Sequence, residues 1–220
     1  MRKFNRLAVL GMVMAAAAVL LVPAAHADSI TPLNYSASNG SGPFGSVTLH
    51  EVDANTVQVT LSLTSGEVFA VTGAGAGALG FNIDKSFTLV LSPALTAGFS
   101  FSGQPGPYGF ASSIGNFTSV ITCSSCGNGT SPPQFSGPVV FRVSNAAGLT
   151  IADFVANGNG YLFASDIGVP NGENGFNTFA VGATTTEITK TPEPGTFVLL
   201  GVGVAGLLGL GLLRKQAVLA

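Results

Sequence analysis

Apolar and polar residues alternate along two neighbouring segments in the first third of the chain. Residues 46–52 and 56–63 place an apolar side chain at nearly every second position, and Asp53, Ala54 and Asn55 separate them. This alternation has the period of a β-strand with one buried and one wet face, and short polar separators of this kind form turns. The pattern predicts a β-hairpin.

Later segments extend the β pattern. They are rich in β-branched and aromatic residues and end in clusters of Gly, Pro, Asn or Ser, which favours strands at 87–91, 117–122, 139–143, 160–164 and 179–183. Only residues 148–156 favour a helix, with Thr150 as N-cap and Asp153 three residues later. About seven to nine short strands predict an all-β fold, a single jelly-roll-like β-sandwich domain spanning residues 28–190.

Residues 1–27 have the organisation of a secretory signal peptide. Three basic residues near the start precede the apolar run 7–22, and Ala25 and Ala27 are the small residues that signal peptidase requires. We expect export through the Sec translocon and cleavage after Ala27, which makes Asp28 the first residue of the mature chain. An uncleaved anchor is the alternative, and Pro23 disfavours it.

The chain ends in a second apolar segment. Residues 196–213 carry no charge, and as a helix they span about 27 Å, just enough to cross a bilayer. Arg214 and Lys215 follow at once, so the positive-inside rule places the tail in the cytoplasm and the preceding body outside. This predicts a transmembrane helix that anchors the exported body in the inner membrane.

Pro192, Glu193 and Pro194 stand immediately before that helix. The two prolines bar a helix there, so the junction is stiff and extended. The order of tripeptide, Gly-rich apolar helix and basic pair resembles the PEP-CTERM sorting signal of exopolysaccharide-producing bacteria, over residues 191–220. The resemblance implies that an exosortase-type transpeptidase recognises the tripeptide, removes the helix and delivers the body to the cell surface or the extracellular space. A plain anchor with a Pro-rich stalk is the alternative.

The body also resembles a recurrent domain type of exported PEP-CTERM proteins. The resemblance rests on the opening hairpin, on Gly80-Phe81-Asn82, on a phenylalanine-rich middle and on the segments 163–167 and 175–176. This domain type has no assigned chemistry, so the resemblance supports the fold more than a function.

The number and sign of the charged residues limit the kinds of partner that the chain can bind. Only 8% of the residues are charged, against about 25% in an average soluble domain. Residues 28–190 hold three basic and nine acidic residues, a net charge of about −6, without a basic stripe to neutralise phosphates. The composition therefore excludes nucleic acid as a partner.

Cys123 and Cys126 form a Cys-x-x-Cys motif. A thioredoxin-like redox pair begins a helix, whereas here a Gly- and Pro-rich stretch follows, which favours a small loop disulfide made in an oxidising compartment. His50 is the only histidine after residue 27, so we expect neither a structural zinc site nor a cofactor.

Three sets of residues suggest other chemistry. Phe99, Phe101 and Tyr108, with Phe110, are candidates for an aromatic platform that binds extracellular polysaccharide. His50 or a carboxylate pair would be needed for a secreted hydrolase, but no Gly-x-Ser-x-Gly elbow accompanies them. A loop containing Asp166, Asn171, Glu173 and Asn174 offers oxygen ligands for calcium, without the spacing of an EF-hand.

Taken together, these patterns favour a non-enzymatic protein with no catalytic residues. Its expected role is structural, or display of the exported body in exopolysaccharide or biofilm. A carbohydrate-binding module is the first alternative, and a secreted hydrolase is the second.

Overall fold

The computed structural model describes residues 28–38, 40–71, 77–91, 98–102, 106–127, 135–172 and 175–184, and Gly203. Both signal peptide and sorting tripeptide lie outside these residues, as does the segment 196–213 apart from Gly203. Within the described part of the chain, no helix is both long and apolar enough to span a bilayer. The strands all belong to one compact unit, Asp28–Thr189.

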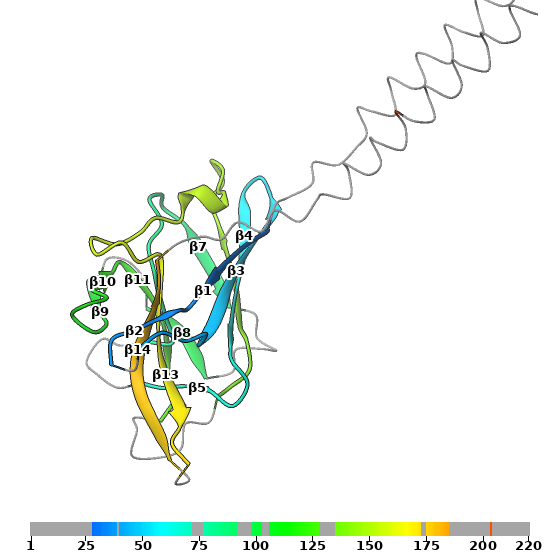
Figure 1. Ribbon diagram of the computed structural model, residues 1–220. Helices are drawn as coiled ribbons and strands as arrows, with labels where there is room; N and C mark the ends of the chain where they lie inside the picture. Colours follow the sequence, from blue (N-terminus) through cyan, green and yellow to red (C-terminus); the bar gives the residue numbers. More distant parts are fainter. Residues whose placement is uncertain are drawn as a thin grey trace, which may run out of the picture. The chain divides into compact units, whose positions relative to one another are not determined.

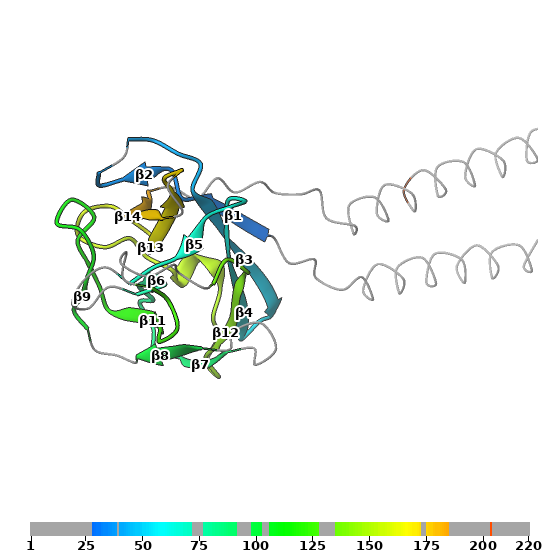
Figure 2. The same ribbon diagram turned by 90° about the horizontal axis from the view of Figure 1, so that it is seen from below.

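The protein is all-β, and its strands form two antiparallel sheets that face each other in a sandwich-like arrangement (Figures 1 and 2). The five-stranded sheet has the order β1 (Asp28–Pro32), β3 (Gly45–Asp53), β4 (Thr56–Leu63), β12 (Val139–Ser144) and β7 (Thr88–Leu91). The seven-stranded sheet has the order β2 (Tyr35–Ser36), β14 (Phe176–Ala183), β13 (Phe163–Pro170), β6 (Leu79–Phe81), β11 (Ser119–Cys123) and β8 (Phe99–Ser102), and β5 (Val68–Phe69) pairs with β13. A separate pair consists of β9 (Tyr108–Gly109) and β10 (Asn116–Phe117).

The predicted hairpin is confirmed as β3 and β4. Leu49 pairs with Val59 in the ladder, and both side chains are fully buried against the facing sheet. At the turn, the backbone N–H of Asn55 donates to Oδ1 of Asp53 over 2.8 Å, as Asp does in short turns. Alternation therefore turned the apolar side chains of both strands toward the core.

The consecutive strands β6, β7 and β8 pair with the consecutive strands β11, β12 and β13, and together they wrap around the core as a two-stranded ribbon. The strands β6, β7 and β8 pair antiparallel with β13, β12 and β11 respectively. Because β7 and β12 belong to the five-stranded sheet and the other four strands to the seven-stranded one, the ribbon crosses from sheet to sheet twice. In Figure 2, β7 and β8 adjoin where the ribbon passes between the sheets.

Phenylalanine rings fill the space between the sheets. The ring of Phe81 lies 5.5 Å from that of Phe141 and 6.3 Å from that of Phe154, centroid to centroid. Burying one such side chain stabilises the fold by roughly 2 to 3 kcal/mol. The largest fully buried aromatic residues of this core are Phe69, Phe81, Phe141 and Phe163, whereas Phe117 lies in a smaller separate cluster.

The predicted helix over 148–156 is wrong in length. A single 3-10 turn, η1 (Ile151–Asp153), forms, and the Asp153 carboxylate accepts the backbone N–H of Thr150 over 2.7 Å. Directly after the turn, Phe154 is extended, packs into the core and forms a β-bridge with Ile83. The predicted capping pair is confirmed, but burial of the Phe154 ring ends the helix after one turn.

The strand predicted at 160–164 begins later and runs further, as β13. Asn157 folds the chain into a tight turn, because its Oδ1 accepts the backbone N–H groups of Asn159 and Tyr161, both over 3.0 Å. Gly160 has a φ of +87° in this turn, a conformation that glycine adopts without strain. The turn delays the strand to Phe163.

The Gly80-Phe81-Asn82 segment has a packing role in the fold. A Cβ atom on Gly80 would collide with the rings of Phe110 and Phe117, so these rings lie against bare backbone. The buried Asn82 side chain accepts the backbone N–H of Thr118 over 2.8 Å, at the break between β10 and β11. The predicted strand 117–122 is therefore interrupted at Thr118.

Candidate functional site

Cys123 and Cys126 form the predicted disulfide, which is confirmed. Their Cα atoms lie 5.5 Å apart, Cys123 at the end of β11 and Cys126 in the loop that follows. Between them, the backbone N–H of Ser124 donates to the Gly98 carbonyl over 2.9 Å. The bridge thus fixes a loop against the start of β8.

The prediction that Phe99 belongs to an exposed aromatic platform is wrong. Phe99 is only 8% exposed, and its ring packs edge-on against Phe69 and Phe135 at centroid distances of 5.4 and 4.8 Å. Phe101 and Tyr108 are half-buried, and the Phe101 ring lies 5.9 Å from that of Phe87 in the core. These side chains do not make one exposed surface.

The predicted calcium-binding loop does not contain Asp166. Asp166 lies within β13 with 1% of its surface exposed, rather than in the loop that follows the strand. Asn171 comes just after β13, while Glu173 and Asn174 lie outside the described residues. Across the part of the chain that is described, no three His, Cys, Asp or Glu side chains come together as a metal site.

His50 pairs with a carboxylate on the outer face of the five-stranded sheet. Its Nδ1 lies 2.5 Å from Oδ1 of Asp28, the residue directly opposite it in the β1–β3 ladder. Both side chains are almost half exposed. A hydrolytic triad would need a hydroxyl on the other ring nitrogen, and none of the described hydroxyls bonds to it.

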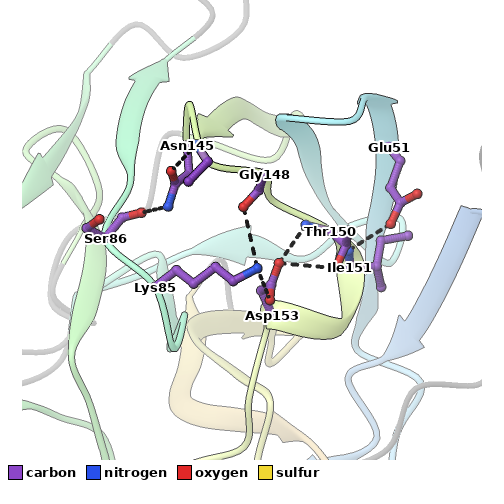
Figure 3. A network of polar contacts seen from close by, with 9 residues as sticks. Glu51, Lys85, Ser86, Asn145, Gly148, Thr150, Ile151 and Asp153 are labelled. Atoms are coloured by element: carbon purple, nitrogen blue, oxygen red, sulfur yellow. Dashed lines mark hydrogen bonds and ion pairs between the residues drawn. The ribbon is translucent and has the colours of Figure 1, made fainter.

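A network of polar contacts joins the loops that carry Lys85 and Asn145 to η1 and β3 (Figure 3). Lys85 Nζ lies 2.8 Å from Oδ1 of Asp153 and also donates to the Gly148 carbonyl over 3.4 Å. The second carboxylate oxygen of Asp153 accepts from the backbone N–H and the hydroxyl of Thr150. Asp153 therefore joins the loop before η1 to the loop that carries Lys85.

The electrostatics of Asp153 follow from these contacts. Burial alone would raise the pKa of its carboxyl, but the hydrogen bonds from Lys85 and Thr150, together with the charge of Lys85, hold the pKa below its ordinary value. Asp153 thus stays ionised and paired at neutral pH, which suits a structural clamp rather than a proton donor.

Two further bonds complete the network. The backbone N–H of Ile151 donates to Oε1 of Glu51 on β3 over 2.9 Å, and Nδ2 of Asn145 donates to the Ser86 carbonyl over 2.8 Å (Figure 3). Sequence analysis missed the network, because Lys85 and Asp153 lie far apart along the chain and no motif links them.

An open hollow of about 350 Å³ lies beside this network. The residues that line it are mostly polar: Ser86, Phe87, Thr88, Ser144, Asn145 and Ala146. Its volume is at the lower end of the range for small-ligand sites.

Glu67 is a buried acid directly before β5. It is 7% exposed, and its Oε2 has no hydrogen-bond partner. Burial raises the pKa of the Glu67 carboxyl to about 7, although the hydrogen bond from the Thr64 backbone acts in the opposite direction.

The predicted processing residues lie outside the described part of the chain. These are Ala25 and Ala27, Pro192, Glu193 and Pro194, and Arg214 and Lys215. The structure therefore presents the body alone, with a disulfide, a clamp and an open hollow. Comparison of the chain with protein-family models, with curated proteins and with solved structures finds no match.

Proposed function

We propose that this protein is exported, held briefly by its C-terminal helix and then displayed as a β body at the cell surface or in the extracellular matrix. Its role is structural, in exopolysaccharide or biofilm, and no reaction is carried out by its own side chains. Pro192, Glu193 and Pro194 act as substrate residues for an exosortase-type transpeptidase.

The observation that carries the proposal is the ordered sequence of export and sorting signals around the β body. The strand β1 begins at Asp28, the residue after the predicted cleavage site, and the compact unit ends at Thr189, just before the tripeptide. The body thus falls between the two predicted processing points. The disulfide adds support, because such bonds persist in oxidising compartments outside the cytosol.

The topology supports the finer description of the body as a jelly-roll-like sandwich. A two-stranded ribbon that crosses between two sheets is the wrapping of that fold. Sandwiches of this type place loops at both ends of a rigid body, which suits display on a surface.

The intact mass of the protein from its native host tests this proposal. We expect a mature form that starts at Asp28 and lacks the helix, recovered outside the inner membrane, while a Glu193→Ala form keeps the helix and stays in the membrane. A Glu187→Ala form, which changes an acidic residue before the tripeptide, serves as the matched control and should be processed like the wild type. An uncut helix in the wild-type protein would overturn the proposal.

A further inference from the structure

The outer face of the five-stranded sheet carries two cross-strand rows of residues next to the hollow. Gln58, Arg142 and Val90 occupy one row across β4, β12 and β7, and Thr56, Ser144 and Thr88 occupy the next. These residues point outward, since the residues that alternate with them are buried or half-buried against the core. We call these six residues the β4–β12–β7 face.

Arg142 carries the one unpaired positive charge of this face. Its side chain is exposed, and Nε donates to Oε1 of Gln58 over 3.3 Å, which orients the guanidinium across the strands. The other described cation, Lys85, is held by Asp153. No carboxylate of the described residues pairs with Arg142, so its remaining N–H donors face solvent.

The hollow continues this face. Ser144 and Thr88, which pair with each other in the ladder, line the hollow as well as the second row. Phe87 is the aromatic residue of the lining, half-buried with its ring against that of Phe81, and the half-buried or exposed residues Ser86, Thr88 and Ser144 line the hollow beside it. A ligand in the hollow can therefore reach Arg142 along the same side of β12.

The chemistry of the face argues against a macromolecular partner that needs apolar anchors or many cations. Among the six residues of the face, Val90 is the only large apolar one, and it is 63% exposed. Protein interfaces instead centre on buried aromatic anchors. A single arginine cannot neutralise the run of phosphates that a nucleic acid presents. What remains is a ligand rich in hydroxyl groups that also carries a carboxylate.

We infer that the β4–β12–β7 face and its hollow bind an acidic polysaccharide, with one sugar residue in the hollow and a uronate carboxylate against Arg142. The site rests on the proposed function, because it names what the displayed body would hold. The short Ser and Thr side chains lose little conformational freedom on binding. The bond between guanidinium and carboxylate is charge-assisted and has a fixed geometry, so it contributes most of the specificity.

The charges elsewhere on the same sheet fit this orientation. One exposed carboxylate borders the face, that of Asp53, which lies opposite Thr56 in the β3–β4 ladder. On the row of Arg142, the nearest carboxylate is that of Asp28, at the opposite edge, where His50 pairs with it. An acidic polymer therefore meets Arg142 first when it approaches from β7, the edge that borders the hollow.

Affinity electrophoresis of the full chain in neutral detergent tests the site, with polygalacturonate or uncharged dextran in the gel. We expect retardation by polygalacturonate that weakens with salt, and little by dextran. Arg142→Gln should weaken binding at least tenfold, and Arg142→Lys should restore part of it because the charge remains. The double variant Ser144→Ala/Thr88→Val should lose binding without any change of charge.

The matched control is Ser100→Ala, which removes an exposed strand hydroxyl from β8 in the other sheet. It should bind like the wild type, and the thermal unfolding of every variant should match that of the wild type before binding is compared. Absence of polygalacturonate binding, equal retardation by dextran, or unchanged binding of both Arg142→Gln and the double variant would overturn the inference. Binding is measured on the uncut chain, so its result does not depend on processing at the tripeptide. The binding inference can therefore fail while the proposed processing is correct, and the proposed processing can fail while the binding inference is correct.

Discussion

The carboxylate of Asp28 and the imidazole of His50 lie 2.5 Å apart, which ties the first residue of β1 to the strand beside it. Asp28 is also the residue that the predicted cleavage after Ala27 would leave at the N-terminus. The predicted scissile bond therefore directly precedes a paired strand. Because signal peptidases act on extended, accessible chain, the predicted cleavage would have to come before β1 docks or during its transient opening.

Replacing His50 with Gln tests how much this pair contributes to stability. Both side chains are exposed to solvent, so we expect the free energy of unfolding to fall by less than about 1 kcal/mol. Urea unfolding followed by circular dichroism measures the change. A loss of several kcal/mol would mean that the docking of β1 depends on the pair.

Substitution of the buried hydroxyls of β1 should stabilise the protein. Oγ of Ser29 and Oγ1 of Thr31 have no hydrogen-bond partner, and both face the apolar core beside Leu49 and Val47. Thr31→Val keeps the shape and removes the buried polar group, so the free energy of unfolding should rise by about 1 kcal/mol. Thr48→Val, on the solvent side of β3, is the matched control and should give no gain. A lower stability of Thr31→Val would show that the hydroxyl is satisfied.

Glu67 should make stability depend on pH between about 4.5 and 7. Because the pKa of Glu67 is raised to about 7 in the folded chain, the folded state binds the proton more tightly than the unfolded state. The contribution of Glu67 to stability is then complete below pH 4.5, falls as the pH rises to about 7, and levels off above that.

The Glu67→Gln variant separates this group from the other acids. Its amide resembles the protonated acid, so the fall in the free energy of unfolding between pH 4.5 and 7 should largely disappear. In the wild type this fall is at most about 3 kcal/mol. Asp84→Asn, which changes an exposed carboxylate, should keep the wild-type profile. Identical pH profiles for Glu67→Gln and the wild type would contradict this account.

The clamp at Asp153 should act in the opposite direction. Because its pKa is lowered in the folded state, its contribution is complete above the unfolded pKa and is lost as the pH falls through the lowered value. Asp153→Asn should lower the free energy of unfolding at pH 7 by about 1 to 2 kcal/mol. Thermal unfolding at pH 7 and at pH 3 measures this, and the difference between variant and wild type should shrink at the lower pH.

Gly80→Ala should destabilise the fold because a methyl group has no space beneath the Phe110 and Phe117 rings. We expect a loss of about 1 to 3 kcal/mol from forced movement of the rings. Gly158→Ala, where nothing lies within 4 Å of the added carbon, is the matched control. Equal stability of both variants would show that the rings move aside without cost.

Local patterns predicted the local structure well. The alternation in 46–52 and 56–63 sufficed for the hairpin, because the period of two and the polar turn are properties of neighbouring residues. The same holds for the disulfide, since Cys123 and Cys126 are close in sequence and the loop between them needs no distant partner.

Errors arose where distant contacts overrode local preference. The helix predicted at 148–156 ends after one turn because Phe154 packs into the core. Phe99 was predicted to be a surface aromatic residue, but its ring is buried against the rings of Phe69 and Phe135. Neither ring contact follows from spacing along the chain.

The β character, the hairpin, the capping pair of Thr150 and Asp153 and the disulfide could all be predicted from the amino-acid sequence, since each depends on residues a few positions apart. Which strands are neighbours follows from the packing of the whole chain, and so do the Arg142–Gln58 contact, the hollow and the Lys85–Asp153 clamp. The physical reason is that strand pairing closes long loops, and the register that wins is the one that buries the most apolar side chains across the whole core.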